Sequence, residues 1–429
     1  MSDRSRPGTS IRTTASLAAV AIFLAGCSSS SSLAPAIGSN LSQARVYGSQ
    51  TVLAHRRSAP PLARLVNETV LYAFGGGSDG SDPQADLTNV GGVLYGTTYG
   101  GGGYTCFSTT CGTIFKVTAA GNETVLHRFT GGSDGAGPLG SLTNLGGMLY
   151  GTNSSGLSAS GNGQVFKISK TGGFTELHTF GGDPDGANPQ AGLIKVGGAL
   201  YGTTLFGGDG CASPGCGSFF SISPSGQEHV LYSFEGGPDG ANPYANLTDV
   251  KGTLYGTTDR GGSSGDGTVY QITTSGHETV IYTFPGGADG ANPQAALTNV
   301  NGALFGTASA GGNDGAGIVF SISRSHVFSV LYSFKGEPDG AEPEAGLTNI
   351  GGALYGTTAL GGANGLGTVF KITKDGTYTQ LYSFAGGSDG AMPMSGLTEV
   401  DGTLYGTTSA GGGTGCGGAG CGTIFSLSL

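Results

Sequence analysis

The chain has 429 residues, of which 87 are glycine and 11% are charged, whereas soluble proteins average roughly 7% glycine and about 25% charged residues. The 37% of hydrophobic residues, with 17 Tyr and 20 Phe, suffice for a core and exclude a largely disordered chain. The formal net charge is −10, and no basic stripe remains after residue 26. Since phosphate binding needs clustered Lys and Arg, nucleic acid is excluded as a partner.

Residues 1–26 predict a lipoprotein signal peptide. Three arginines precede the apolar run 16–26, which is too short for a membrane-spanning helix of about 20 residues. The run ends in Leu24-Ala25-Gly26-Cys27, which resembles the bacterial lipobox, where the cysteine is lipidated and becomes the mature N-terminus. An ordinary secretory signal with a chance cysteine is the alternative. We therefore expect a membrane anchor at Cys27, and Ser28, in place of an Asp retention signal, favours the outer membrane or cell surface.

Residues 27–67 follow as a Ser/Ala-rich segment without periodicity. Such a composition predicts a flexible tether between the lipid and a folded body.

From residue 68 to residue 429 the sequence repeats with a period near 50 residues, typical of solenoids, propellers and other arrays. The marker is an Asp followed by Gly, with a proline four residues after the Asp. It recurs at Asp79, Asp134, Asp185, Asp239, Asp289, Asp339 and Asp389. An aromatic residue always lies 16 positions after the Asp, from Tyr95 to Tyr405.

Each repeat contains four short β-rich runs of the forms AxLTNV, GxLYGTT, GTVFKIT and TVLYSF, bounded by turn residues. Their lengths predict strands, and apolar residues on both faces predict sheets covered on both sides. The last repeat lacks its fourth run, while an extra copy, residues 68–74, precedes the first repeat. We therefore predict an all-β, seven-bladed β-propeller of four-stranded blades, closed by strand 68–74 completing the last blade. An open solenoid or two half-domains is the alternative.

The repeat LYSFxGGxDGAxPxAxLTxVxGxLYGTTxxGGxxGxGTVFKIT resembles the GloVer tandem repeat of bacterial exported proteins described as choice-of-anchor tandem repeat proteins. The resemblance covers residues 68–429 and implies varied modes of anchoring, here a lipid, but no established reaction. Repeats two (GTNSSG) and five (LFGTAS) depart from the pattern, which weakens any strictly sevenfold site.

Six further cysteines form three pairs with the same CxxxxC spacing, and all lie in the loop between the second and third runs. The pairs are Cys106 with Cys111, Cys211 with Cys216, and Cys416 with Cys421. Export supplies the oxidising compartment that disulfides require, so we predict three local staples. Metal binding is the alternative, but zinc sites gather four ligands, and pairs on separate blades would be too far apart to share an ion.

The repeated Asp is interpreted as a turn residue. The Asp accepts backbone hydrogen bonds, the following Gly takes a positive φ, and the Pro fixes entry into the next strand. Calcium binding is the rival interpretation, suggested by Asp183-Pro184-Asp185-Gly186, although the later acids of an EF-hand loop are missing. The six histidines form no repeated geometry and no GxSxG or HExxH motif occurs, so we predict no catalytic residue, metal or cofactor.

Variable loops on a rigid scaffold usually carry binding, so the face with the DGAxP and Cys-bearing loops is the candidate interaction face. We expect a monomeric binding scaffold for a glycan or an envelope protein. The alternatives are an exported hydrolase or lyase acting on polysaccharide and a purely structural surface protein. Aromatic residues available for sugar stacking are Tyr99, Tyr104, Phe107, Phe206 and Tyr244.

Overall fold

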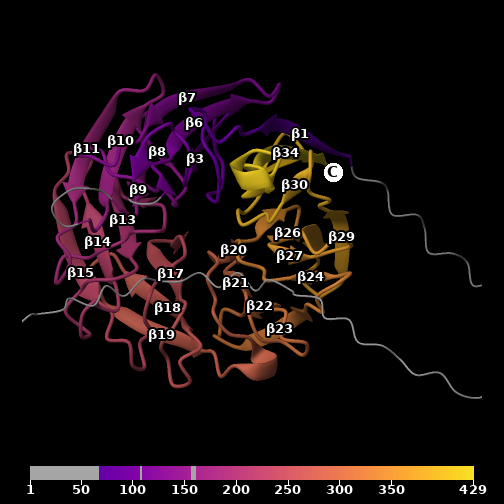
Figure 1. Cartoon of the computed structure of the whole chain (residues 1–429). Helices are drawn as coiled ribbons and strands as arrows, with labels where there is room; N and C mark the ends of the chain where they lie inside the picture. Colours follow the sequence, from indigo (N-terminus) through magenta and orange to yellow (C-terminus); the bar gives the residue numbers. More distant parts are fainter. Residues whose placement is uncertain (1–66, 107–108, 156–160) are drawn as a thin grey trace, which may run out of the picture. The chain divides into compact units, whose positions relative to one another are not determined.

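A computed structural model describes residues 67–106, 109–155 and 161–429. The predicted signal peptide, Cys27 and the tether lie outside the described residues, except for Asn67. The described chain forms seven four-stranded antiparallel sheets arranged as the blades of a ring (Figure 1). Among the described residues only two 3-10 turns, Gly287–Asp289 and Cys416–Gly418, are helical. The predicted seven-bladed β-propeller is confirmed.

Each blade runs from a three-residue inner strand to a six-residue outer strand. In the first blade these strands are β2 (Thr88–Val90), β3 (Val93–Thr98), β6 (Thr113–Thr118) and β7 (Glu123–Arg128). The next five blades repeat this order with β8 (Thr143–Leu145), β9 (Met148–Asn153), β10 (Gln164–Ser169) and β11 (Phe174–Thr179); β12 (Ile194–Val196), β13 (Ala199–Thr204), β14 (Ser218–Ile222) and β15 (Glu228–Ser233); β16 (Thr248–Val250), β17 (Thr253–Thr258), β18 (Thr268–Thr273) and β19 (Glu278–Thr283); β20 (Thr298–Val300), β21 (Ala303–Ala308), β22 (Ile318–Ile322) and β23 (Phe328–Ser333); and β25 (Thr348–Ile350), β26 (Ala353–Thr358), β28 (Thr368–Ile372) and β29 (Tyr378–Ser383).

The seventh blade joins the two ends of the described chain. Its strands are β31 (Thr398–Val400), β32 (Thr403–Thr408) and β34 (Thr423–Ser428), followed by β1 (Glu68–Ala73) as the outer strand. The β1 and β34 strands pair antiparallel, with Glu68 opposite Leu427 and Ala73 opposite Thr423. Figure 1 shows the first strand, in indigo, beside the last, in yellow. The predicted closure by the N-terminal strand is confirmed.

Neighbouring blades are held together by a repeated edge-to-face aromatic pair. A phenylalanine directly after each outer strand, such as Phe74 after β1, packs against the aromatic residue of the third strand of the next blade, such as Phe115 in β6. The seven pairs are Phe74–Phe115, Phe129–Phe166, Phe180–Phe220, Phe234–Tyr270, Phe284–Phe320, Phe334–Phe370 and Phe384–Phe425, with ring centroids 5.2–5.6 Å apart. Such pairs contribute about 0.5–1.5 kcal/mol each beyond the burial of their area.

A second set of contacts surrounds the axis. A threonine at the start of the inner strand donates its hydroxyl proton to a leucine carbonyl of the next blade, as from Thr88 to Leu142 at 2.5 Å. The bond recurs from Thr143, Thr248, Thr298, Thr348 and Thr398. In the third blade Ile194 replaces the threonine, and the Gly192 amide instead donates to Asn246 Oδ1 of the following blade, at 2.5 Å.

The departures in repeats two and five are compensated inside their own blades. In most blades two buried hydroxyls pair between the second and third strands, as Thr98 and Thr113 do at 2.9 Å. The second blade has a bond from Asn153 Nδ2 to Gln164 Oε1, at 3.2 Å, in the same place. In the fifth blade the corresponding neighbours are the fully buried Ala308 and Ile318. Each departure therefore changes a matched pair and leaves the blade intact.

Removing β1 tests the closure. A chain truncated before Gly75 exposes the edge of β34, so we expect aggregation or a melting temperature lower by at least about 10 °C. Appending a four-residue turn and the sequence of residues 68–74 after Leu429 rebuilds the outer strand as an ordinary hairpin and should restore the transition. Truncation before Asn67, which keeps β1, is the control. Unchanged stability of the first variant, measured by thermal unfolding, would contradict closure by this strand.

Candidate functional site

The DGAxP loops and the loops after the second strands lie on one face of the ring, because they are bridged to each other in every blade. In the first repeat a backbone bridge joins Ser81 with Gly100. In the seventh, Ala391 pairs with Ala410 through the short strands β30 (Gly390–Ala391) and β33 (Ala410–Gly411). The other bridges are Ala136–Ser155, Ala187–Phe206, Ala241–Arg260, Ala291–Ala310 and Ala341–Leu360. We call this surface the DGAxP face.

The seven repeated aspartates are separate, each serving the turn of its own blade. Asp239 is 9% exposed, and its Oδ2 accepts hydrogen bonds from the Glu235 amide and the Tyr232 hydroxyl, both at 2.8 Å. Asp79, Asp339 and Asp389 accept the same two kinds of bond. Asp289 accepts the Tyr282 hydroxyl at 3.4 Å. These contacts agree with the turn interpretation, whereas the calcium alternative stays a prediction.

The aromatic donor was missed at the sequence level, although it always lies seven residues before the aspartate. In the second and third repeats it is a histidine: His127 Nε2 lies 3.1 Å from Asp134, and His178 Nε2 lies 3.2 Å from Asp185. These contacts contribute to lowering the pKa of both aspartates, against the opposing effect of burial. The constant spacing was the signal that could have revealed this pair.

The glycine after each aspartate is required by close packing in every blade and, in five of the seven, also by a positive φ. Gly240 has a φ of 100°, as the turn interpretation expects, and a Cβ there would lie 2.3 Å from Thr258 Oγ1. Gly340 and Gly390 do not take a positive φ, so the expectation is wrong for these two blades. A Cβ at either would lie 2.5 Å from a threonine methyl group, so there the close packing alone demands glycine.

All three predicted cysteine pairs are disulfides, with Cα–Cα distances of 5.2 Å (Cys106–Cys111), 5.6 Å (Cys211–Cys216) and 5.3 Å (Cys416–Cys421). Each packs against a glycine of the adjacent DGAxP loop: a Cβ on Gly76, Gly131 or Gly236 would lie 2.3–2.6 Å from a disulfide sulfur. The disulfides therefore support the turns of the DGAxP face.

Blade junctions near the rim carry a second acidic position. A glutamate at the start of four outer strands lies near the turn aspartate of the preceding blade; these are Glu68, Glu123, Glu228 and Glu278. Burial, followed by the charge of that aspartate, raises the pKa of each to about 7. The other three junctions place a ring there instead, as with Phe174 stacked on His127 at 4.2 Å.

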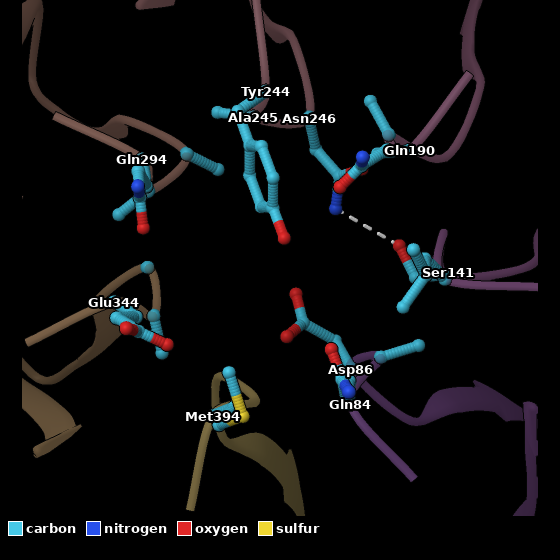
Figure 2. Close-up of a pocket in the computed structure, with 17 residues that line it drawn as sticks. Gln84, Asp86, Ser141, Gln190, Tyr244, Ala245, Asn246, Gln294, Glu344 and Met394 are labelled. Carbon is cyan, nitrogen blue, oxygen red and sulfur yellow. Dashed lines mark hydrogen bonds between the residues drawn. The ribbon is translucent and has the colours of Figure 1, made fainter. Parts of the chain in front are cut away.

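The strongest candidate for binding is a cavity on the axis, shown in Figure 2. The residue after each repeat proline lines it, so all seven blades contribute one side chain. These residues are Gln84, Leu139, Gln190, Tyr244, Gln294, Glu344 and Met394. Polar side chains two residues further along the chain also line the cavity. Asn246 Nδ2 donates to Ser141 Oγ at 2.9 Å, and Asp86 accepts a hydrogen bond from the Gly396 amide at 2.6 Å.

The residue before the proline orients the side chains that line the cavity. It takes a left-handed conformation in every blade, from Asp82 at a φ of 56° to Met392 at 56°. The Asp82 carboxylate then accepts from Gln84 Nε2 at 3.0 Å, and Asn188 Oδ1 accepts from Gln190 Nε2 at 2.9 Å. The amides at the cavity are thus held in place before any ligand arrives.

The cavity is acidic. Burial, then the charges of Glu344 and Asp259, raises the pKa of Tyr244 to about 12, so its hydroxyl stays protonated. Burial and the nearby Glu342 and Asp259 raise the pKa of Glu344 to about 7. Burial also raises the pKa of Asp86. No Lys, Arg or His is among the lining residues.

The cavity has a volume of about 80 Å³, whereas sites for whole small molecules measure roughly 300–1,000 Å³. It can hold a few waters or one small functional group, since one water needs about 10–15 Å³. A sugar ring does not fit without movement of the lining side chains.

The predicted stacking aromatics are only partly brought together. Tyr244 lines the axis, and Tyr99 lies within electrostatic range of it. Tyr104 is 49% exposed, Phe206 lines a separate cavity of about 320 Å³ with Asp183 and Asn188, and Phe107 lies outside the described residues. The sequence therefore identified one aromatic residue of the axial cavity, Tyr244, and missed its polar neighbours.

Residues 62–214 and 209–425 match a family model described as the Gloeobacter/Verrucomicrobia repeat. No curated protein matches the chain. Within the part of the chain that is described, no helix has the length and apolar character needed to cross a membrane.

Three similar solved structures have TM-scores of 0.41–0.42. The tricorn protease is 10% identical over 76% of this chain, which spans only 27% of that protein. The PQQ-bound aldose sugar dehydrogenase of Streptomyces coelicolor is 15% identical, over 86% of this chain and 99% of that one. A putative glucose dehydrogenase of Thermus thermophilus is 17% identical, over 84% and 99%. At this level the similarities carry no functional argument.

The Asp239 turn gives one prediction. Asp239→Ala leaves the Glu235 amide and the Tyr232 hydroxyl without their acceptor, so the free energy of unfolding should fall by about 1–3 kcal/mol. Asp239→Asn keeps one acceptor oxygen and should lose less. Denaturant unfolding measures both. Equal stability of the alanine variant and the wild type would refute the structural role.

The rim glutamates predict a pH dependence. Their pKa rises from 4.5 in the unfolded chain to about 7 in the folded one, so between these values the folded state binds more protons and stability falls as pH rises. The lowered pKa values of Asp134 and Asp185 affect stability in a different pH range, because the stability that they contribute is lost only as the pH falls below about 4.

We therefore expect the melting temperature to drop by a few degrees between pH 5 and pH 8. The triple variant Glu68→Gln, Glu123→Gln, Glu278→Gln should flatten this profile, whereas Asp314→Asn, at an exposed loop position, should not. A profile that is equally steep in both variants would rule out the rim glutamates as its cause.

Proposed function

This chain belongs to the Gloeobacter/Verrucomicrobia repeat family, and from that premise we propose that it is an exported, lipid-anchored binding scaffold at the cell envelope. It acts as a monomer and recognises a neutral, hydroxyl-bearing group, such as the end of a glycan chain, at the axial cavity of the DGAxP face. Cys27 supplies the anchor. Three disulfides are compatible with an extracellular location.

One observation carries the binding role: the repeats differ where they meet at the axis. The flanking prolines are constant and the next residue is small in every repeat, being Ala, Gly or Ser, yet the position between them carries Gln, Leu, Tyr, Glu or Met. A position needed only for folding would be expected to carry the same kind of residue in every repeat. This one combines a rigid frame with an asymmetric set of donors and acceptors, as a specific site requires.

The charge of the cavity narrows the ligand class. Asp86 and Glu344 line it, and Asp82 and Asp259 lie near Tyr244. Anionic polysaccharides would be repelled, whereas sugar hydroxyls can donate to the carboxylates and amide oxygens and accept from the Tyr244 hydroxyl. The small volume favours insertion of one hydroxyl-bearing group, with the rest of the ligand lying across the face.

A second candidate is a polysaccharide hydrolase. One observation favours it: Glu344 has a pKa raised to about 7, a value suited to a general acid, and Asp86 supplies another carboxylate in the same cavity. Turnover, and not binding, separates the two candidates.

The test uses the full chain on an array of neutral and anionic glycans, with parallel assays for released product. We expect retention of neutral glycans without turnover. Tyr244→Ala should weaken binding by roughly 10–100-fold, since a buried hydroxyl bond and a ring contact are lost. Tyr104→Ala, the same change at an exposed position of the DGAxP face, is the matched control and should bind as the wild type does.

The outcomes are distinct. Equal binding by both tyrosine variants would move the site away from the axis, and no binding to any glycan would overturn the ligand class. Product release that is abolished by Glu344→Gln would establish the hydrolase instead.

A further inference from the structure

The junction between the second and third blades gathers three side chains that can bind a metal. His178 lies on β11, Asp185 in the DGAxP loop that follows, and Glu228 at the start of β15. One ligand atom from each lies within 4.8 Å of the other two, and all three residues are partly buried. His178 Nε2 lies 3.2 Å from Asp185 Oδ2.

Glu228 has an unused acceptor at this place. Its Oε1 is buried and has no hydrogen-bond partner among the described residues, as is also true of Glu68, Glu123 and Glu278, so the histidine is what sets this junction apart. A buried carboxylate oxygen without a partner is unfavourable. A cation between Glu228 and Asp185 would satisfy this oxygen and remove the repulsion between the two carboxylates.

The other junctions show why this one differs. Where Glu123, Glu278 and Glu68 take the place of Glu228, the residue in the place of His178 is Tyr72, Tyr232 or Tyr382. A protonated phenol donates to the aspartate but is a poor metal ligand. At the junction with the other histidine, His127, the glutamate is replaced by Phe174, which stacks on the imidazole at 4.2 Å. Among the seven junctions of the described ring, only this one combines histidine, aspartate and glutamate.

We propose that His178, Asp185 and Glu228 form a zinc site that joins the second blade to the third. A neutral imidazole nitrogen and two carboxylate oxygens are a donor set that Zn²⁺ accepts, with a water in the fourth position. Ca²⁺ fits less well, because it takes six to eight oxygen ligands. Zinc–ligand distances of about 2.0–2.2 Å place tetrahedral ligands roughly 3.3 Å apart. The three ligand atoms, now within 4.8 Å of one another, would therefore have to move inward to coordinate the ion.

Zinc at this place would replace the proton shared between His178 and Asp185 and would tie β11 to β15 across the junction. The expected consequence is stabilisation of the folded chain by mass action, because the unfolded chain does not hold the three ligands together. The site lies on the rim and uses none of the residues of the axial cavity, so it is independent of the proposed glycan binding.

The test measures zinc stoichiometry and affinity of the untagged, chelator-treated full chain, with free thiols alkylated, by native mass spectrometry and competition with a zinc dye. We expect one Zn²⁺ per chain. His178→Tyr, which copies the residue present at five other junctions, should fold and should weaken zinc binding by at least about 100-fold. Glu228→Phe, which copies Phe174 and Phe328, should do the same.

Two further variants make the result specific. His127→Tyr changes a histidine that lacks a facing glutamate and should leave zinc binding unchanged. Phe174→Glu brings a carboxylate to His127 and Asp134, and should raise the stoichiometry to two Zn²⁺ per chain. Absence of zinc binding at tens of micromolar metal, or retention of it in both His178→Tyr and Glu228→Phe, would overturn the proposal.

Discussion

Antiparallel pairing between β1 and β34 is the constraint on which the ring depends, because it makes the first strand part of the last blade. It supports two junctions at once. Phe74, just after β1, packs on Phe115 of the first blade, and Glu68 lies near Asp389 at the junction with the sixth. The remaining aromatic pairs and inner-ring threonine bonds join neighbours in the same way around the ring. The aromatic pairs can form at all seven junctions, and the threonine bonds in the six blades that carry the threonine, only if the ends meet. Closure therefore converts local contacts into a continuous circle.

Much of this fold is predictable from sequence because the spacing between the aspartate, the proline and the aromatic residue is constant, and because one strand copy is displaced to the N-terminus. The contacts between blades are harder to predict. Glu68 and Asp389 are far apart in the chain and approach each other only after closure. The pairing of Tyr232 with Asp239 is different: both lie in one repeat, at a fixed separation of seven residues, and periodicity alone could have revealed it.

The irregular repeats show what a departure from the pattern means. Judged one residue at a time, Asn153 in the second repeat and Ala308 in the fifth look like losses of the threonine found elsewhere. Their strand partners change with them, to Gln164 and Ile318, so one blade keeps a polar bond and the other becomes apolar. A buried polar group left alone would be destabilising. The matched changes keep a polar pair in the second blade, although Asn153 Oδ1 there has no hydrogen-bond partner among the described residues, and they remove the pair from the fifth. These departures are therefore evidence about packing and not about a lost site.

Positions at the axis and at the rim tolerate changes that positions inside a blade do not, and the physical reason is their geometry. A residue within a blade faces partners from its own repeat, so a change there must be matched locally. The residue after each proline faces the axis, where its neighbours come from other repeats and the shared cavity of about 80 Å³ tolerates different side chains. Rim junctions are similar, since His178 meets Glu228 from the next blade. Asymmetry can therefore accumulate at these two places without unfolding a blade, and it is there that Tyr244 and Glu344 share a cavity and that one histidine faces two carboxylates.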